Sequence, residues 1–196
     1  MHISEGVLSP GVLMVGGILT LGGLFWGLKI IKTEDLPKIA VLSSTFFVAS
    51  LIHIPIGPTS AHLILNGLVG ILLGWAAFPA IFLGLIFQAL LFQFGGFTTL
   101  GVNTFAMAFP AVISYYLFSL FKRHSKLLFL GAFLGGAQAI ILGTIFISIA
   151  LLETEKSFLS MVTALLTTHF PIAIIEGIIT GLVVSYLKKV KPEVLK

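Results

Sequence analysis

Long, uninterrupted apolar runs dominate the chain, and short polar segments separate them. The runs lack the alternation of polar and apolar residues that marks the strands of a membrane-spanning barrel. A helix needs about 20 apolar residues to cross the hydrocarbon core of a bilayer, and fewer where protein shelters its ends. We therefore predict an all-α polytopic membrane protein. Its seven transmembrane helices are expected at 10–31, 39–54, 61–75, 78–94, 102–121, 127–152 and 161–187.

Helix-start and helix-breaking residues mark the ends of these spans. Ser9 and Pro10 resemble a helix N-cap followed by proline at the first helical position. The cluster PIGPTS at 55–60 separates the second span from the third. The third and fourth spans are joined so tightly around Pro79 that we expect them to form an antiparallel pair.

Composition supports the same class. Of the 196 residues, 58% are hydrophobic and 9% are charged, and the mean hydropathy is +1.15. So few charges cannot coat a soluble domain of this size. Cysteine is absent, which excludes disulfides and thiolate ligands. The net charge of +4 does not indicate nucleic-acid binding, because the basic residues form no soluble stripe.

The basic residues lie almost entirely on one side of the predicted spans. Lysine and arginine near span ends mark the cytoplasmic side of a membrane protein. With the N-terminus outside and the C-terminus cytoplasmic, only Lys156 falls outside. The inner side then receives Lys29, Lys32, Lys38, Lys122, Arg123, Lys126, Lys188, Lys189, Lys191 and Lys196. We expect one membrane domain over 1–196, with an extracytoplasmic segment at 1–9 and a cytoplasmic basic tail at 188–196.

The polar stretch MHISEG at 1–6 carries the first candidate chemistry. It lacks the basic region and cleavage site of a secretory signal, so we expect it to stay on the mature protein. The α-amine of Met1, the backbone nitrogen of His2 and His2 Nδ1 can chelate one ion in a five-membered and a six-membered ring. This planar nitrogen edge suits Ni(II) or Cu(II) better than zinc or magnesium, and its binding should weaken as pH falls. The simpler interpretation of the dipeptide alone is a frayed tail.

The predicted topology gathers four of the five histidines on one membrane face. His2 lies outside, His53 ends the second span, His62 begins the third, and His169 stands near the outer part of the seventh. Only His124 falls inside, in a basic loop where it is expected to be an ordinary solvated residue. Burial and helix propensity do not require this convergence, although chance alone can produce it.

Two pairs of polar residues inside the spans are functional candidates. The four-residue spacing of His62 and Asn66 predicts that they share one helical face. An interfacial histidine bonded to a carbonyl is the alternative for His62. The seven-residue spacing of His169 and Glu176 also predicts a shared face, with Glu176 roughly 10 Å deeper.

Glu176 is the one carboxylate inside a predicted span, and a carboxylate at that depth needs a partner or a proton. We favour a structural bridge to groups such as Gln88 or Gln138, or a hydrogen bond that orients a ligand histidine, over direct contact with a metal. A role as proton carrier stays open.

The stretch 95–103 is too polar and too rich in glycine for exposure to lipid. We expect it to fold over protein and to help close the outer site. Asn103 is its residue best suited to a specific hydrogen bond.

Four motifs, in order along nearly the whole chain, resemble the cobalt/nickel substrate-binding component of energy-coupling factor transporters. The first contains His2 and the second ends at His62 before two further glycines, Gly67 and Gly74. The motifs are MHIxEG at 1–6, PTSAH at 58–62, GGFTTLGVNTFxM at 95–107 and PIAIIEG at 171–177. The resemblance implies seven helices with an external N-terminus.

The resemblance also implies a site for the transported ion. This is a square-planar nitrogen site formed by the terminal amine of Met1, the amide nitrogen and imidazole of His2, and His62 on the third helix. It implies that Asn103 braces the N-terminal segment. Glu5 is expected to help shape the turn that brings the segment to His62.

The implied function is substrate capture in an ATP-driven uptake transporter for nickel or cobalt. Its partners are a membrane coupling subunit, a pair of cytoplasmic ATPases and, in some members, small accessory membrane proteins. The chain itself is then no enzyme and holds no permanent cofactor, and its place is the cytoplasmic membrane of a bacterium or archaeon. Relatives often carry Gly-Gly or His-Pro-Thr-Gly near the third-helix histidine, where this chain has 65–67 LNG, and its His53 and His169 are additional. These differences leave the choice between nickel and cobalt open.

Two other functions compete with transport. An intramembrane metalloenzyme could use His62, His169 and Glu176 around zinc, but the chain lacks a motif such as His-Glu-x-x-His. A haem-binding electron-transfer subunit could use His53 and His169 as axial ligands, and the purified protein would then be strongly coloured at haem wavelengths.

Overall fold

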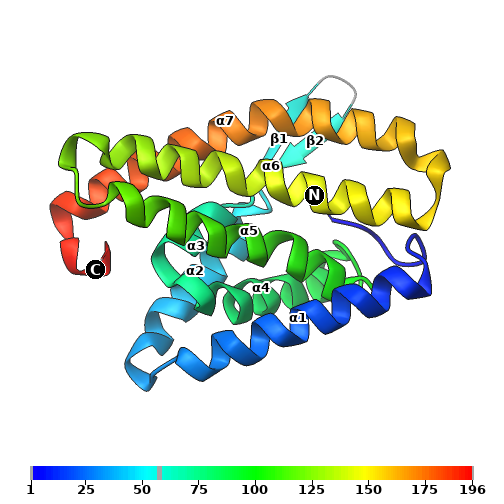
Figure 1. Cartoon of the computed structure of the whole chain (residues 1–196), viewed down its shortest axis with the longest axis horizontal. Coiled ribbons are helices and arrows are strands. Elements are labelled where there is room, and N and C mark those ends of the chain that lie inside the picture. Colours follow the sequence, from blue (N-terminus) through cyan, green and yellow to red (C-terminus); the bar gives the residue numbers. More distant parts are fainter. Residues whose placement is uncertain (1, 57–58, 196) are drawn as a thin grey trace.

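The computed structural model describes residues 2–56 and 59–195, which fold into a helical bundle with one short hairpin (Figure 1). Its α-helices are α1 (Pro10–Ile30), α2 (Leu36–Ala49), α3 (Asn66–Leu73), α4 (Ala77–Phe92), α5 (Leu100–Phe121), α6 (Leu128–Thr154) and α7 (Leu159–Val190). Strands β1 (His53–Ile56) and β2 (Thr59–His62) pair in antiparallel fashion between α2 and α3.

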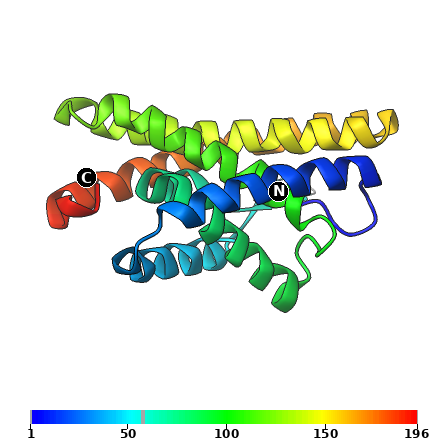
Figure 2. The same ribbon diagram turned by 60° about the horizontal axis from the view of Figure 1, so that its bottom comes forward.

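Helix α5 is the centre of the bundle. It packs against α1, α3 and α4 on one side and against α6 on the other, and α6 in turn packs along α7. Figure 2 shows α6 along one side of the molecule and α2 and α4 along the opposite side. Glycine allows close contacts between helices: a Cβ at Gly101 would lie 2.8 Å from Cα of Gly17, and one at Gly67 would lie 2.7 Å from Cα of Gly136. Small residues of this kind let helices in a membrane approach closely.

Within the described residues, five stretches are long and apolar enough to cross a membrane, so the expectation of seven spans is not confirmed. They are Pro10–Ile30, Asn66–Phe92, Leu100–Phe121, Leu128–Thr154 and Lys156–Val190. Helix α2 has 14 residues and falls short of this length. The chain is therefore a polytopic helical membrane protein.

Helices α3 and α4 run in opposite directions, although they share few contacts with each other. Helix α3 follows α5 in the same direction, because Gly70 lies against Ala111 and Gly74 faces the ring of Tyr115. Gly74 has a φ of +57° and ends α3, and the 3-10 turn η2 (Gly74–Ala76) follows it. Helix α4 then begins beside α1 and runs back toward the N-terminal segment.

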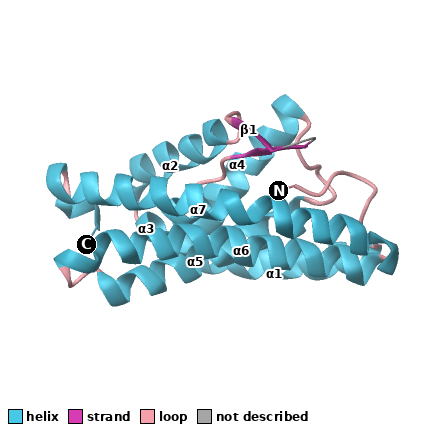
Figure 3. Ribbon diagram, turned by 90° about the horizontal axis from the view of Figure 1, so that it is seen from above, coloured by secondary structure: helices cyan, strands magenta, loops and turns pink. Residues whose placement is uncertain are grey.

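The predicted second and third spans are wrong where they adjoin. Helix α2 ends at Ala49, and the chain then forms the hairpin in place of continuing as helix to 54. Proline at 55 cannot donate a helical hydrogen bond and biases the residue before it toward extended structure. In the hairpin, His53 stands opposite His62 in register, and β2 contacts α7. Figure 3 shows the strands, in magenta, near the end of α2.

His62 therefore ends a strand and does not begin a helix. Leu65, between His62 and Asn66, has a left-handed φ of +57°, and α3 starts only at Asn66. The expectation that His62 and Asn66 share one helical face is wrong for this reason. The four-residue spacing has no meaning across a strand and a turn.

Candidate metal-binding site

The N-terminal segment is fastened to the first turn of α5 through the backbone of Ile3. The N–H of Ile3 donates to Oδ1 of Asn103 at 3.0 Å, and Nδ2 of Asn103 donates to the carbonyl of Ile3 at 3.0 Å. The hydroxyl of Thr99 donates to the same carbonyl at 2.8 Å. Ile3 itself is buried. As a result the segment runs back from the start of α1 into the bundle (Figure 1).

A turn at Glu5 and Gly6 connects this fastened segment to α1. Gly6 has a φ of +75°, a conformation that favours glycine. The carboxylate of Glu5 accepts hydrogen bonds from the backbone N–H of Thr98, at 3.1 Å, and from the Thr98 hydroxyl. The hydroxyl and then the N–H hold the pKa of Glu5 below its usual value, because both stabilise the charged form.

The fastening brings the ring of His2 against the ring of His62. Their centroids lie 4.9 Å apart and their planes differ by 13°. Phe94, in the loop after α4, lies nearly parallel to both, with its centroid 6.2 Å from His2 and 6.4 Å from His62. The N–H of Phe94 donates to the carbonyl of Gln88 at 3.2 Å, which fixes the loop at the end of α4. Sequence reasoning missed Phe94.

Both ring nitrogens of His2 are buried and lack a hydrogen-bond partner among the described residues. Burial lowers the pKa of His2 well below its usual value, so its imidazole is neutral with a lone pair at pH 7. Nδ1 of His62 lies 3.1 Å from the carbonyl of Leu63. If Nδ1–H donates there, the lone pair of that imidazole lies on Nε2.

Glu176 positions the turn that follows His62. Its carboxylate oxygens each accept from the N–H of Leu65 at 3.0 Å, and Oε1 also accepts from the N–H of Ile64. The expected bridge to Gln88 or Gln138 is not what satisfies this carboxylate. Two backbone donors at the start of α3 do so, and the left-handed turn at Leu65 is what exposes them.

Two other candidate residues, Asn66 and His169, form their hydrogen bonds with groups other than His2 and His62. Asn66 donates from Nδ2 to the carbonyl of Met107 at 3.0 Å and so joins α3 to α5. Nδ1 of His169 lies 2.9 Å from the carbonyl of Leu165, one turn earlier in α7. Neither side chain is bonded to His2 or His62.

Met1 and the side chain of His53 lie outside the described residues. Within 2–56 and 59–195, no group of three or more histidine, aspartate or glutamate side chains could hold a metal. His62, His169 and Glu176 therefore do not assemble the zinc site of the metalloenzyme alternative.

Comparison with known proteins places the chain among transporters. The family model described as "Cobalt uptake substrate-specific transmembrane region" matches residues 2–194. A Haemophilus influenzae protein assigned to metal transport is 41% identical, over 100% of this chain and 97% of its own length. An Archaeoglobus fulgidus protein assigned as the fused nickel transport protein NikMN is 32% identical, over 100% of this chain and 68% of its own. The crystal structure of a truncated transition metal transporter superposes with a TM-score of 0.74 and 29% identity, covering 96% of this chain and 99% of the other.

Proposed function

Because the chain belongs to the family of cobalt uptake substrate-specific transmembrane regions, we propose that it captures nickel or cobalt for an ATP-driven uptake transporter. The family makes it a multi-pass protein of the cytoplasmic membrane and a component of metal uptake, and its relatives are named as transport proteins. The ion is the cargo that this component passes on, so no catalytic residue is needed.

The proposed site holds the ion in a square of four nitrogens. They are the terminal amine of Met1, the backbone nitrogen and imidazole of His2, and Nε2 of His62. Two imidazoles on adjacent corners of such a square, bound at about 2 Å, have centroids about 4.5 Å apart. The observed 4.9 Å between the two rings is compatible with this arrangement. Planar nitrogen coordination disfavours magnesium and calcium, which prefer oxygen ligands.

The observation that carries the proposal is that both buried ring nitrogens of His2 lack a hydrogen-bond partner among residues 2–56 and 59–195. Leaving a buried polar atom unsatisfied costs about 1–3 kcal/mol, so such atoms need an explanation. Here the chain fastens Ile3 with three hydrogen bonds and thereby holds His2 in this position. A metal ion would bind the imidazole that the fold has left without a partner.

Several neighbours support the site without touching the ion. Asn103 and Glu5 hold the N-terminal segment, and Glu176 fixes the turn after His62. Phe94 covers the rings and limits the access of water. Asn66 joins α3 to α5, and His169 is hydrogen-bonded within α7.

We further propose that the site formed by His2 and His62, called the histidine site below, faces the outside and that the C-terminus is cytoplasmic. The placement of lysine and arginine supports this orientation. Energy would come from a membrane coupling subunit with a pair of cytoplasmic ATPases. Residues 1–9 would form the capture segment of a single membrane domain.

A two-residue extension tests the site without changing any side chain. Adding two alanines ahead of Met1 moves the amine away from His2 and should reduce nickel and cobalt affinity more than about 100-fold. Two residues are added because a single one would place the histidine third, where the terminal amine, two amide nitrogens and the imidazole chelate nickel by themselves. A matched protein with two alanines added after the last residue should bind normally. Isothermal titration of both in detergent measures the difference. Unchanged affinity in the N-terminal variant would refute the terminal chelate.

A further inference from the structure

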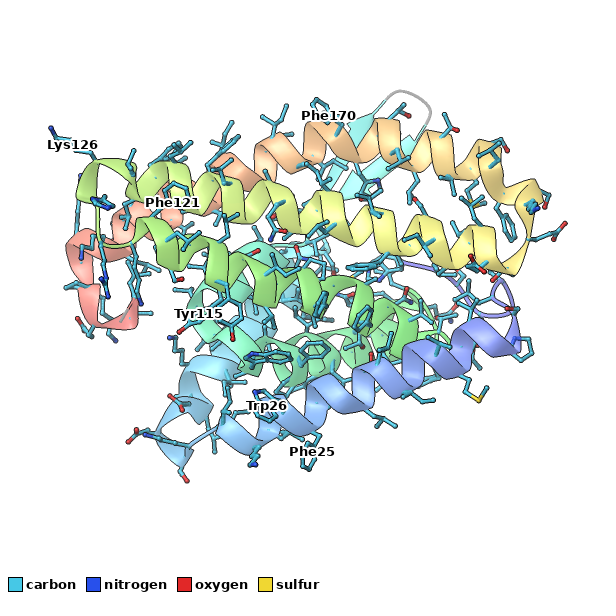
Figure 4. All side chains as sticks on the ribbon, in the orientation of Figure 1. Phe25, Trp26, Tyr115, Phe121, Lys126 and Phe170 are labelled. Atoms are coloured by element: carbon cyan, nitrogen blue, oxygen red, sulfur yellow. The ribbon has the colours of Figure 1, made fainter. Side chains whose placement is uncertain are left out.

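A pocket lies at the end of the bundle where α5 and α7 finish and α6 begins, far from the histidine site. It has a volume of about 350 Å³. Its lining includes Phe118, Lys122, Arg123, Leu128, Lys188 and Leu195. Figure 1 shows the C-terminus beside the connection from α5 to α6, and the labelled Phe121 and Lys126 mark the same end in Figure 4. We call this the basic pocket.

The basic pocket brings three cations together, and no carboxylate of the described residues pairs with them. Lys122 and Arg123 follow α5, and Lys188 belongs to the last turn of α7. Among the described residues the one ion pair is between Lys32 and Glu34, so these three cations have no carboxylate within ion-pairing distance. Like charges around one cavity repel each other, and a bound anion would relieve that repulsion.

The floor and one wall of the pocket are apolar and fixed. Phe118 and Leu128 are buried, with 3% and 6% of their surfaces exposed. The wall comes from the 3-10 turn η5 (Pro192–Leu195), which contributes Leu195. Nζ of Lys38 in α2 donates to the carbonyl of Val194 at 3.2 Å and so fastens this turn to the bundle. The pocket is therefore built from segments far apart in the sequence.

Exposed apolar side chains continue from this end along the surfaces of α5 and α7. Leu120 is 70% exposed, Tyr186 63% and Leu182 59%. In a membrane protein such faces contact lipid chains. A ligand with an anionic head and apolar tails fits both features, whereas free phosphate would use only the cations.

We propose that the basic pocket binds the phosphate headgroup of an anionic phospholipid, with the acyl chains along α5 and α7. Clusters of lysine and arginine at the cytoplasmic side are typical recognition sites for anionic lipids. The pocket holds the headgroup between Lys122, Arg123 and Lys188 and anchors the ends of α5 and α7 to the leaflet. This site is independent of metal capture.

Native mass spectrometry of the protein in mild detergent, titrated with phosphatidylglycerol, phosphatidylcholine or inorganic phosphate, tests the proposal. The pocket variant is Lys122→Gln, Arg123→Gln and Lys188→Gln. The control variant is Lys126→Gln, Lys189→Gln and Lys191→Gln, which removes the same charge at the same end outside the lining. We expect the native protein to retain phosphatidylglycerol in preference to phosphatidylcholine. Retention of phosphatidylglycerol should be about tenfold or more weaker in the pocket variant, and within about twofold of the native value in the control.

Three results would overturn the proposal. Equal losses in both variants would indicate a diffuse surface charge, and phosphate binding as tight as lipid would indicate a free-anion site. Undiminished lipid retention by the pocket variant would show that these three cations do not hold the headgroup. Metal binding at the histidine site verifies that each variant is folded. If the triple variant does not fold, single changes at Arg123 and Lys188 should each weaken lipid retention about threefold.

Discussion

Buried polar side chains differ in their hydrogen-bond partners between the histidine site and the helices α6 and α7. In the two long helices most hydroxyls donate to a carbonyl one turn earlier, as Ser148 does to Thr144 at 2.8 Å. His169 contacts its own helix in the same way. At the histidine site the backbone beside His2 is bonded, yet both ring nitrogens of His2 are buried with no hydrogen-bond partner among the described residues.

This difference separates polar residues that serve the fold from those that serve a ligand. A helix can satisfy its own hydroxyls, so a polar side chain within it needs no further function. Thr180 and Gln138 in the long helices also keep one unpartnered atom each, but these are a hydroxyl and an amide oxygen. Imidazole is the better ligand for nickel, and here it faces a second imidazole.

The largest expected effect is a difference in nickel affinity between variants that lack a histidine in one region or the other. Replacing His62 with alanine should reduce nickel affinity more than about 100-fold, because one of four ligands is lost. The matched change His169→Ala should leave the affinity within about twofold, since the hydrogen bonds of that ring among the described residues lie within α7. Isothermal titration of both variants measures this ratio. Similar losses of nickel affinity in the two variants would contradict the assignment of His62, and not His169, to the metal site.

The next effect concerns the fastening of the segment. Asn103→Ala removes both hydrogen bonds to Ile3 and should weaken nickel binding about 10- to 100-fold. Thr20→Val is the control, because it removes a hydrogen bond between α1 and the carbonyl of Gly101 without touching Ile3. It should lower stability with an affinity change below about threefold. Equal effects on affinity would mean that Asn103 acts only through general stability.

Glu176 should show a mixed effect on fold and binding. Glu176→Ala leaves the N–H groups of Ile64 and Leu65 without their acceptor, which should cost about 1–3 kcal/mol of stability and weaken nickel binding about tenfold. Glu176→Gln keeps one acceptor oxygen and should fall between the native protein and the alanine variant. Thermal unfolding in detergent and nickel titration measure the two effects. A stability loss with unchanged affinity would limit Glu176 to a structural role.

The smallest effect is expected at the exposed Glu5 and depends on pH. Its pKa in the fastened segment lies below the usual 4.5, so its contribution is fully present above pH 4.5 and is lost as pH falls through the lowered value. Hydrogen exchange of the Ile3 amide should therefore show a loosening below about pH 4.5. Glu5→Gln should lack this step and exchange about two- to threefold faster at pH 7, whereas Glu155→Gln should match the native protein. An unchanged step in Glu5→Gln would assign the titration to another group.

Hydropathy predicted the long helices well. The expected spans at 102–121 and 127–152 differ from α5 and α6 by no more than two residues at either end. Their continuous apolar runs and short charged loops leave few alternatives. The same measure failed from Leu51 to Leu65, because an apolar segment containing proline can pair as a hairpin as readily as it can end a helix.

The site was predictable only in part. The sequence indicated His2 through its place beside the chain start, His62 through its place at the end of a span, and Asn103 through its amide in a glycine-rich stretch. Phe94 gave no signal, since it is one of 18 phenylalanines. The partners of Glu176 were also hidden, because backbone donors exposed by a left-handed turn at Leu65 leave no trace in the sequence.

The coordination of bound nickel tests the central claim most directly. The protein with its native N-terminus, loaded with nickel, should contain one equivalent per chain, appear yellow and be diamagnetic, with four nitrogen ligands by X-ray absorption. Square-planar nickel has these properties because strong nitrogen donors pair its electrons. A six-coordinate paramagnetic ion, or a protein that retains no nickel, would contradict the proposed site at His2 and His62.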